Sequence, residues 1–278
     1  MAIAGKYNTL NITKIVDFGI YLDGGEFGEI LLPMKWVPDN TKPDDHLEVF
    51  VYFDSSDRII ATTMKPYAQV GDFAFLRVKA VNDVGAFLDW GLEKDLLLPY
   101  REQTYAVQKD FSYPVFIFGD PKGRIAASMH LERFIDKDTS SLTAGQEVDL
   151  FIYAASDLGF KAIINNKFEG VIYANEVFRK IERGEKTKGF IKKVREDGKV
   201  DISLYKTGYQ NKIDELSAKI LDSLKNNNGF LPLTDNSQPE DIYKTLGMSK
   251  KNFKKSVGNL LKAGYIILQQ DGISMSED

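Results

Sequence analysis

The stretch that decides the fold runs from Val81 to Pro99 and reads VNDVGAFLDWGLEKDLLLP. Related stretches lie at 17–33, as DFGIYLD followed by GEILLP, and at 157–173, as DLGFKAI followed by EGVIY. A second string follows each copy, as DRIIATT at 57–63, GRIAASM at 123–129 and GKVDISL at 198–204. Two landmarks that recur in the same order indicate a domain that is repeated three times.

The central glycines of the three copies are Gly19, Gly85 and Gly159. Apolar and polar residues alternate around each glycine, which is the period-two pattern of a β-strand. A glycine inside such a pattern is typical of a bulge or a sharp bend. We therefore predict that each copy is a small twisted antiparallel barrel, with the glycine where a strand must bend.

Turn signals and the repeats set the expected domain boundaries. The three barrels are predicted at residues 1–64, 65–135 and 143–205, each with its own core, and the polar segment between the second and third reads as a linker. After Tyr205 the apolar period changes from two to about 3.6, which favours helices. A fourth domain is predicted at 209–278, and its first helical face contains Ile213, Leu216, Ile220, Leu221 and Leu224.

Two further helices and a hairpin complete this fourth domain. Pro239 and Gly247 bracket a short helix, because proline suits a first turn and glycine the position after a helix ends. Ser249 is expected to cap a third helix. The residues of this helix expected to face inward are Phe253, Val257, Leu260 and Leu261. A hairpin turning at Asp271-Gly272 follows, so the pattern predicts a winged helix-turn-helix, and a mostly β chain that ends in an α+β domain.

Composition excludes several classes of protein. The chain has no cysteine and two histidines, His46 and His130, so thiolate nucleophiles, disulfides and Cys/His zinc sites are excluded. No nucleophile elbow, nucleotide loop or acid/base pair with a cleft signature is found, and we expect no enzyme, no cofactor and no metal. No run approaches the roughly 20 apolar residues of a membrane helix, and the N-terminus lacks a secretion signal. We expect a cytoplasmic protein with no membrane partner.

The charge is distributed unevenly. The net charge of the chain is -4, but residues 1–64 hold 5 Lys+Arg against 10 Asp+Glu, whereas residues 141–208 hold 12 against 10. Binding to a polyanion needs local positive charge. The C-terminal half is therefore the expected side for a nucleic acid.

The repeated unit resembles the S1 RNA-binding domain, which is a five-stranded OB-fold. The resemblance lies in the Phe-Gly-x-aromatic strand and in the closing Arg-Ile-x-x-Ser strand. Three such units followed by a winged helix, with PEDIY at 239–243 and MSKKNFKKSVG at 248–258, resemble the bacterial conserved virulence factor B family. This resemblance implies three tandem S1-type OB-fold barrels in a non-catalytic protein that binds single-stranded RNA and regulates gene expression after transcription, virulence included.

S1 domains bind RNA through two aromatics on the glycine strand, a histidine after the third strand, and an Asp/Arg pair at the last hairpin. In the first barrel the matching residues are Phe18, Tyr21, Asp54 and Arg58, with Pro33 in place of the histidine. In the second they are Phe87, Asp120 and Arg124, with Val84 and Pro99 at the other positions. In the third the positions hold Leu158, Lys161, Tyr173, Arg195 and Lys199. No barrel carries the complete set.

The third barrel is predicted to carry the main RNA surface. Between positions 179 and 199 there are nine basic residues and four acidic ones. The basic residues are Arg179, Lys180, Arg183, Lys186, Lys188, Lys192, Lys193, Arg195 and Lys199. We expect Tyr173 to stack on a base while Lys161 and these cations neutralise phosphates.

The third helix of the winged domain carries a lysine stripe, formed by Lys251, Lys254, Lys255 and Lys262. Recognition helices commonly enter a major groove, but this helix has only Asn252 and Asn259 to read base edges. Phosphate contacts with a duplex or docking of a protein partner are therefore favoured over sequence-specific DNA reading. Two alternatives to the RNA hypothesis stay open, a DNA-binding regulator and a protein-interaction scaffold.

Overall fold

The structure is a computed structural model that describes residues 1–119, 123–177, 180–205 and 215–276. The predicted residues Asp120, Arg179 and Ile213 lie outside this described part. The chain divides into two compact units, Met1–Ile135 and Asp136–Asp278. Among the helices of the described residues, none combines the length and the apolar character needed to cross a membrane.

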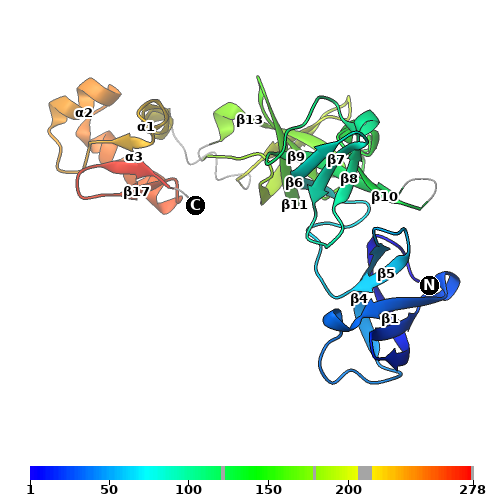
Figure 1. Cartoon of the computed structure of the whole chain (residues 1–278). Coiled ribbons are helices and arrows are strands. Elements are labelled where there is room, and N and C mark those ends of the chain that lie inside the picture. Colours follow the sequence, from blue (N-terminus) through cyan, green and yellow to red (C-terminus); the bar gives the residue numbers. More distant parts are fainter. Residues whose placement is uncertain (120–122, 178–179, 206–214, 277–278) are drawn as a thin grey trace. The chain divides into compact units, whose positions relative to one another are not determined.

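Five strands of the first unit close into the first barrel, in the order β1-β2-β3-β5-β4 (Figure 1). Their bounds are β1 Lys6–Val16, β2 Gly19–Asp23, β3 Glu29–Pro33, β4 His46–Phe53 and β5 Ile59–Thr62. Two short 3-10 helices, η1 Gly25–Phe27 and η2 Met34–Trp36, flank β3. The alternation in the sequence corresponds to the two faces of the strand. Ile20 and Leu22 face the barrel core and are fully buried, whereas Tyr21 between them is partly exposed on the outer face.

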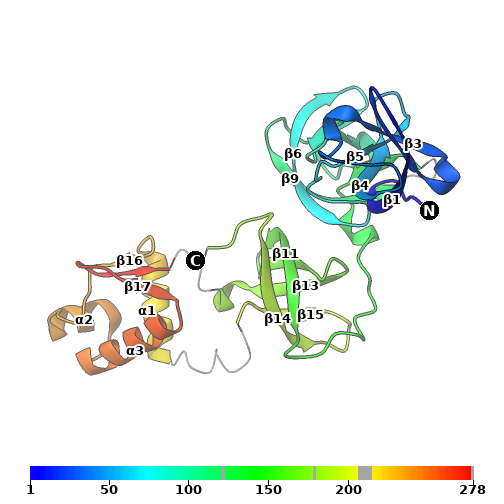
Figure 2. The same cartoon turned by 90° about the horizontal axis from the view of Figure 1, so that it is seen from below.

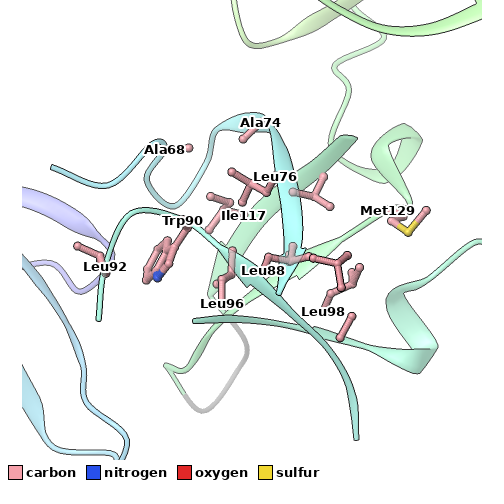
Figure 3. Packing of buried hydrophobic residues seen from close by; sticks show 14 of the residues in the cluster. Ala68, Ala74, Leu76, Leu88, Trp90, Leu92, Leu96, Leu98, Ile117 and Met129 are labelled. Carbon is pink, nitrogen blue, oxygen red and sulfur yellow. The ribbon is translucent and has the colours of Figure 1, made fainter. Parts of the chain in front are cut away.

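The second barrel repeats this strand order with β6 to β10. Its strands are β6 Phe73–Asn82, β7 Gly85–Asp89, β8 Leu96–Pro99, β9 Ser112–Gly119 and β10 Ile125–Ser128, with the 3-10 helices η3 Tyr100–Glu102 and η4 Leu131–Arg133. Figure 3 shows Leu76, Leu88, Leu98 and Ile117 packed together inside it. The first barrel has a buried cluster of its own, which includes Ile12 and Ile20, but Phe50 and Tyr52 of β4 belong to the cluster of the second barrel.

The second unit contains the third barrel, in the order β11-β12-β13-β15-β14 (Figure 2). Its strands are β11 Glu147–Ser156, β12 Gly159–Ile164, β13 Phe168–Tyr173, β14 Lys186–Val194 and β15 Val200–Ser203, with η5 Ala174–Glu176 after β13. In all three barrels one of the five pairings is parallel, for example Leu31 with Ile60. The prediction of a wholly antiparallel barrel is therefore wrong at this closing pair, which joins strands that are not consecutive in the chain.

The repeated glycine allows close approach of two backbones. A Cβ on Gly85 would lie 2.4 Å from the carbonyl oxygen of Leu98, and one on Gly159 would lie 2.1 Å from that of Ile172. Both glycines also adopt positive φ angles, 148° and 144°, which disfavour a side chain. The predicted bulge lies instead on the preceding strand, where the register shifts between Val78 and Ala80. The glycine is thus the first residue of its strand, directly after a tight turn, as Gly85 is in β7 and Gly159 is in β12.

The structure confirms a winged helix-turn-helix after the barrels (Figure 2). Its elements are α1 Glu215–Asn226, β16 Phe230–Leu231, α2 Pro239–Leu246, α3 Lys250–Lys262, β17 Ile266–Leu268 and β18 Ile273–Met275. The predicted end signals are confirmed, because Gly247 ends α2 in the left-handed region and the Ser249 hydroxyl accepts a bond from the Asn252 amide. Leu261 was expected inside but is 42 % exposed, since the inward arc of α3 already holds Leu260 and Val257.

Candidate nucleic-acid interface

An exposed apolar side chain precedes the glycine strand of every barrel. Phe18, Val84 and Leu158 are 60 %, 57 % and 64 % exposed, although each is large and apolar. Each residue lies in the turn before its glycine strand, where the side chain points away from the barrel core. The three barrels therefore present an apolar side chain at the same place, and this side chain is aromatic in the first barrel but aliphatic in the other two.

In the first barrel the two predicted aromatics lie together on the surface. The ring centroids of Phe18 and Tyr21 are 6.3 Å apart with an edge-to-face angle of 85°. The ammonium of Lys14 lies 4.4 Å from the centroid of the Tyr21 ring and 2.8 Å from a carboxylate oxygen of Glu29. The hydrogen bond from Lys14 lowers the pKa of Glu29 and raises the pKa of Lys14, so both groups stay charged. This patch offers ring faces beside a cation.

The predicted Asp/Arg pair of the first barrel is also formed. Arg58 donates from Nε and Nη2 to Asp54 Oδ2 at 2.9 and 2.7 Å, while the other carboxylate oxygen accepts backbone amides of Ser56 and Arg58. Burial acts to raise the pKa of Asp54, but the bonds from Arg58 and Ser56 outweigh it and the pKa is lowered. The Arg58 side chain remains 77 % exposed and can meet an anion.

In the second barrel the corresponding face is hollow. A cavity of about 230 Å³ lies over β7, β8 and β10, and its lining includes Phe87, Leu97, Arg101, Phe118 and Arg124. Phe87 pairs with Leu97 in the sheet, and Leu97 pairs with Ala126 in the parallel closing pair. The predicted residues Phe87 and Arg124 are thus brought to one site. Aromatic rings and guanidinium groups around a cavity are the combination that holds a base and its phosphate.

Sequence analysis missed several residues of this cavity. Phe118 and Arg101 lie outside the S1 pattern, and Tyr52, Phe53 and Lys94 reach the cavity from the region where the first two barrels meet. No spacing within one repeat signals a contact between two repeats. The only available signal was Trp90, one of the two tryptophans of the chain, which follows β7 directly and is buried beside the cavity.

In the third barrel the predicted residues form a closed network of polar contacts. Arg195 donates from Nε to both carboxylate oxygens of Asp201 at 3.1 Å and from Nη2 to Oδ1 at 2.8 Å. The Tyr173 hydroxyl accepts a bond from Arg195 and donates to Asp201 at 3.3 Å. The hydrogen bond to Asp201 raises the pKa of Arg195, which keeps the guanidinium charged. Tyr173 and Arg195 are therefore brought together, but both are engaged by one carboxylate.

The other predicted cations of the third barrel are mostly ion-paired as well. Lys161 lies 3.3 Å from Glu169, which also accepts a bond from Tyr153, and Lys199 lies 2.9 Å from Asp197. Lys192 pairs with Glu176, whereas Lys193 is exposed on β14. Surface pairs of this kind contribute only about 0–1 kcal/mol each, so a phosphate can replace the carboxylate at small cost. The positive charge that the sequence predicts is present but largely compensated.

The lysines of the winged helix are exposed. Lys251, Lys254, Lys255 and Lys262 all point away from the buried residues of α3, such as Phe253 and Leu260. Lys254 lies 3.7 Å from Asp235, a distant ion pair. This helix therefore presents more positive charge to solvent than the face of the third barrel does.

Comparison with known proteins agrees with this architecture. The S1 domain family matches residues 4–64 and 70–130, and the CvfB-like winged helix domain matches residues 218–275. "Uncharacterized protein YitL" of Bacillus subtilis is 31 % identical over 96 % of this chain and 92 % of its own length. The chain belongs to the CvfB-like family. Its S1 and winged-helix domains indicate nucleic-acid binding.

Two further relatives extend over the whole chain. "Conserved virulence factor B" of Staphylococcus saprophyticus is 24 % identical over 99 % of this chain and 95 % of its own length. A crystal structure from Streptococcus pneumoniae, described as a multidomain protein with nucleic acid binding domains, is 23 % identical and covers 98 % of each chain, with a TM-score of 0.43. Both named relatives, from Bacillus subtilis and Staphylococcus saprophyticus, therefore align with this chain over nearly its whole length.

Proposed function

We propose that this CvfB-like chain binds single-stranded RNA without catalysis, through its S1-type barrels and with help from the winged helix, and acts as a post-transcriptional regulator. The S1 domains and a relative named for virulence support the proposal. The observation that carries it is the site on the second barrel, where Phe87 and Arg124 line one cavity. A base offers a π-face to a ring whatever its sequence, and the stacking contributes about 1–3 kcal/mol per base.

The first barrel supplies a second stacking surface in the same unit. Phe18 is exposed, the partly exposed Tyr21 lies beside it, and Lys14 and Arg58 are near enough to the surface to meet phosphates. Residues 1–64 carry a net charge of -5, so we assign this patch to base contacts more than to electrostatic attraction. Its contribution to affinity then depends weakly on salt, because few counterions are released.

The third barrel and the winged helix contribute charge. We assign phosphate contacts to Lys161, Lys192, Lys193, Arg195 and Lys199, with Tyr173 stacking on a base. Four of these five cations must first exchange a carboxylate for a phosphate, which makes the contact adaptable and weakens it. The winged-helix lysines need little such exchange, and we assign them phosphate contacts that depend on no particular sequence.

One titration of the full chain tests the proposal. Oligo-U, duplex RNA and duplex DNA of equal length are titrated at low salt, and binding is followed by fluorescence anisotropy. We expect oligo-U to bind most tightly, because only an unpaired base can enter the cavity or stack on Phe18. Preference for duplex DNA would favour a DNA-binding regulator, and no binding to any of the three would favour a protein-interaction scaffold.

A further inference from the structure

One wall of the cavity on the second barrel comes from the first barrel. Tyr52 and Phe53 at the end of β4, and Asp57 in the β4–β5 turn, line it together with the residues of the second barrel. This turn belongs to the hairpin that carries Arg58 and Asp54, the hairpin expected to serve the first barrel's own site. The hairpin therefore lines the cavity and also carries the Asp54–Arg58 pair of the first barrel.

Direct contacts hold this wall in place. The Lys94 ammonium donates to the backbone oxygen of Asp54 at 2.7 Å and lies 3.4 Å from the Asp57 carboxylate. The Trp90 indole N–H donates to the Lys94 carbonyl at 2.7 Å, which fixes the segment that carries the lysine. Lys35 of the first barrel pairs with Glu93 of the second at 2.5 Å.

The junction behind the wall is buried, since Phe50 and Trp90 are almost fully shielded from solvent. Phe50 meets Trp90 edge to face, with ring centroids 5.7 Å apart, and both belong to one buried cluster. The Val70 amide donates to the Gly5 carbonyl at 2.9 Å, and a Cβ on Gly5 would lie 2.2 Å from a methyl carbon of Val70. Burial raises the pKa of Tyr52 to about 12, with the charges of Glu93 and Asp54 adding to the effect. The wall is thus a fixed part of the cavity.

We propose that the first two barrels form one composite site, in which the junction cavity holds a single unstacked nucleotide of an RNA strand. This inference rests on the proposed function. The cavity of about 230 Å³ is smaller than the roughly 300–1,000 Å³ of sites for drug-sized ligands, so it has room for the base of one nucleotide at a time. The base stacks against Phe87 or Phe118, and Arg124 and Arg101 hold the phosphate. The strand then continues past the shared hairpin to Phe18 and Tyr21.

The charge of Asp57 gives the inference a sharp test. Its carboxylate lines the cavity and opposes a phosphate there, so Asp57→Asn should tighten oligo-U binding about two- to threefold. Asparagine keeps a hydrogen-bond acceptor and tolerates the positive φ of 56° at this position. Asp39→Asn is the matched control, because it removes the same charge from an exposed loop of the same barrel that does not line the cavity.

Trp90 reports occupancy of the cavity. The chain has two tryptophans, so in a Trp36→Phe background Trp90 is the only one. Oligo-U and uridine monophosphate are titrated against the full chain in this background, and Trp90 fluorescence is read beside the anisotropy of labelled oligo-U. We expect both ligands to change the fluorescence of Trp90 in a saturable way, with half-saturation at a lower concentration of oligo-U than of uridine monophosphate. Half-saturation by oligo-U should also need a lower concentration in Asp57→Asn than in Asp39→Asn.

The outcomes separate the inference from the proposed function. Oligo-U binding without a change at Trp90, or equal effects of the two aspartate substitutions, overturns the composite site and leaves RNA binding intact. Tighter binding of uridine monophosphate than of oligo-U assigns the cavity to a free nucleotide and overturns the RNA strand as its ligand. If uridine monophosphate changes Trp90 fluorescence but oligo-U does not bind, the proposed function is contradicted, and the cavity is a site for a free nucleotide. No response to either ligand removes both.

Discussion

The second and third barrels share a strand order but use the same face differently. In the second barrel the face is a cavity lined by Phe87 and Arg124, and its far wall comes from a neighbouring barrel. In the third barrel the equivalent positions hold Lys161 and Lys199, and each is paired with a carboxylate. One fold can thus keep the same surface positions while the side chains there change from the lining of a cavity to a set of ion pairs.

The winged helix gives a reference for both barrels, because its four lysines are exposed and, among the residues that the structure describes, only Lys254 has a carboxylate partner, Asp235. Reversing Lys251, Lys254 and Lys255 to Glu should weaken oligo-U binding roughly a hundredfold at low salt, since about three phosphate contacts at a slope of roughly -0.7 each are lost. Binding is measured by anisotropy across a salt series. The melting temperature should stay unchanged, because these side chains face solvent.

Reversing Lys219, Lys225 and Lys244 to Glu is the matched control, because it makes the same charge change on α1 and α2. If both triple variants lose affinity equally, the effect comes from overall charge. If the α3 variant binds RNA as the unmodified chain does, the lysine stripe serves a protein partner, and the barrels alone account for RNA binding.

The next largest effect should come from the ring in the cavity. Phe87→Ala should weaken oligo-U binding by about 1–3 kcal/mol, the contribution of one stacked base, and leave the salt dependence unchanged. Phe111→Ala is the control, since Phe111 is 60 % exposed in the same barrel and does not line the cavity. Equal losses in the two variants would mean that the ring acts through stability, which a parallel thermal melt would detect.

The contrast between the barrels also shows what could be predicted from the sequence. The repeat, the strand alternation and the caps of α2 and α3 are local, so period and turn chemistry were enough to predict them. The ion pairs of the third barrel could be predicted in part, because Arg195 and Asp201 lie only six residues apart, on either side of one hairpin turn. The cavity could not be predicted from the sequence, because the contacts of Lys94 with Asp54 and Asp57 form only when two repeats pack together.

The paired lysines of the third barrel should have a smaller effect than the ring in the second. Replacing Lys161 and Lys199 with Ala should flatten the slope of log affinity against log salt by roughly 1.4, from two contacts at about 0.7 each. The loss of affinity should be modest, because each lysine gives up a carboxylate partner before it meets a phosphate. The control replaces Lys167, which pairs with Asp136 and is not among the cations expected to meet phosphates. A slope that does not change in the test variant would mean that these pairs stay closed when RNA binds.

The smallest effect is expected at Tyr173, for which the sequence and the structure point to different roles of the side chain. The sequence predicts a stacking ring, whereas the structure shows a hydroxyl bonded to both Arg195 and Asp201. We expect Tyr173→Ala to weaken oligo-U binding by about 1 kcal/mol, the low end of the stacking range, because the ring is half-buried and anchored. The salt slope should stay unchanged, since no cation is removed.

Tyr173→Phe separates the ring from the hydroxyl at this position. Phenylalanine keeps the face that a base can stack on and removes the two hydrogen bonds, each of which contributes about 0.5–1.5 kcal/mol to stability in a typical protein. If the ring is the contact, Tyr173→Phe should bind oligo-U as the unmodified chain does while its melting temperature falls. If Phe and Ala weaken binding equally, the hydroxyl acts by orienting Arg195. The third barrel would then contact RNA through its cations without a stacking ring, and base stacking would belong to the first two barrels.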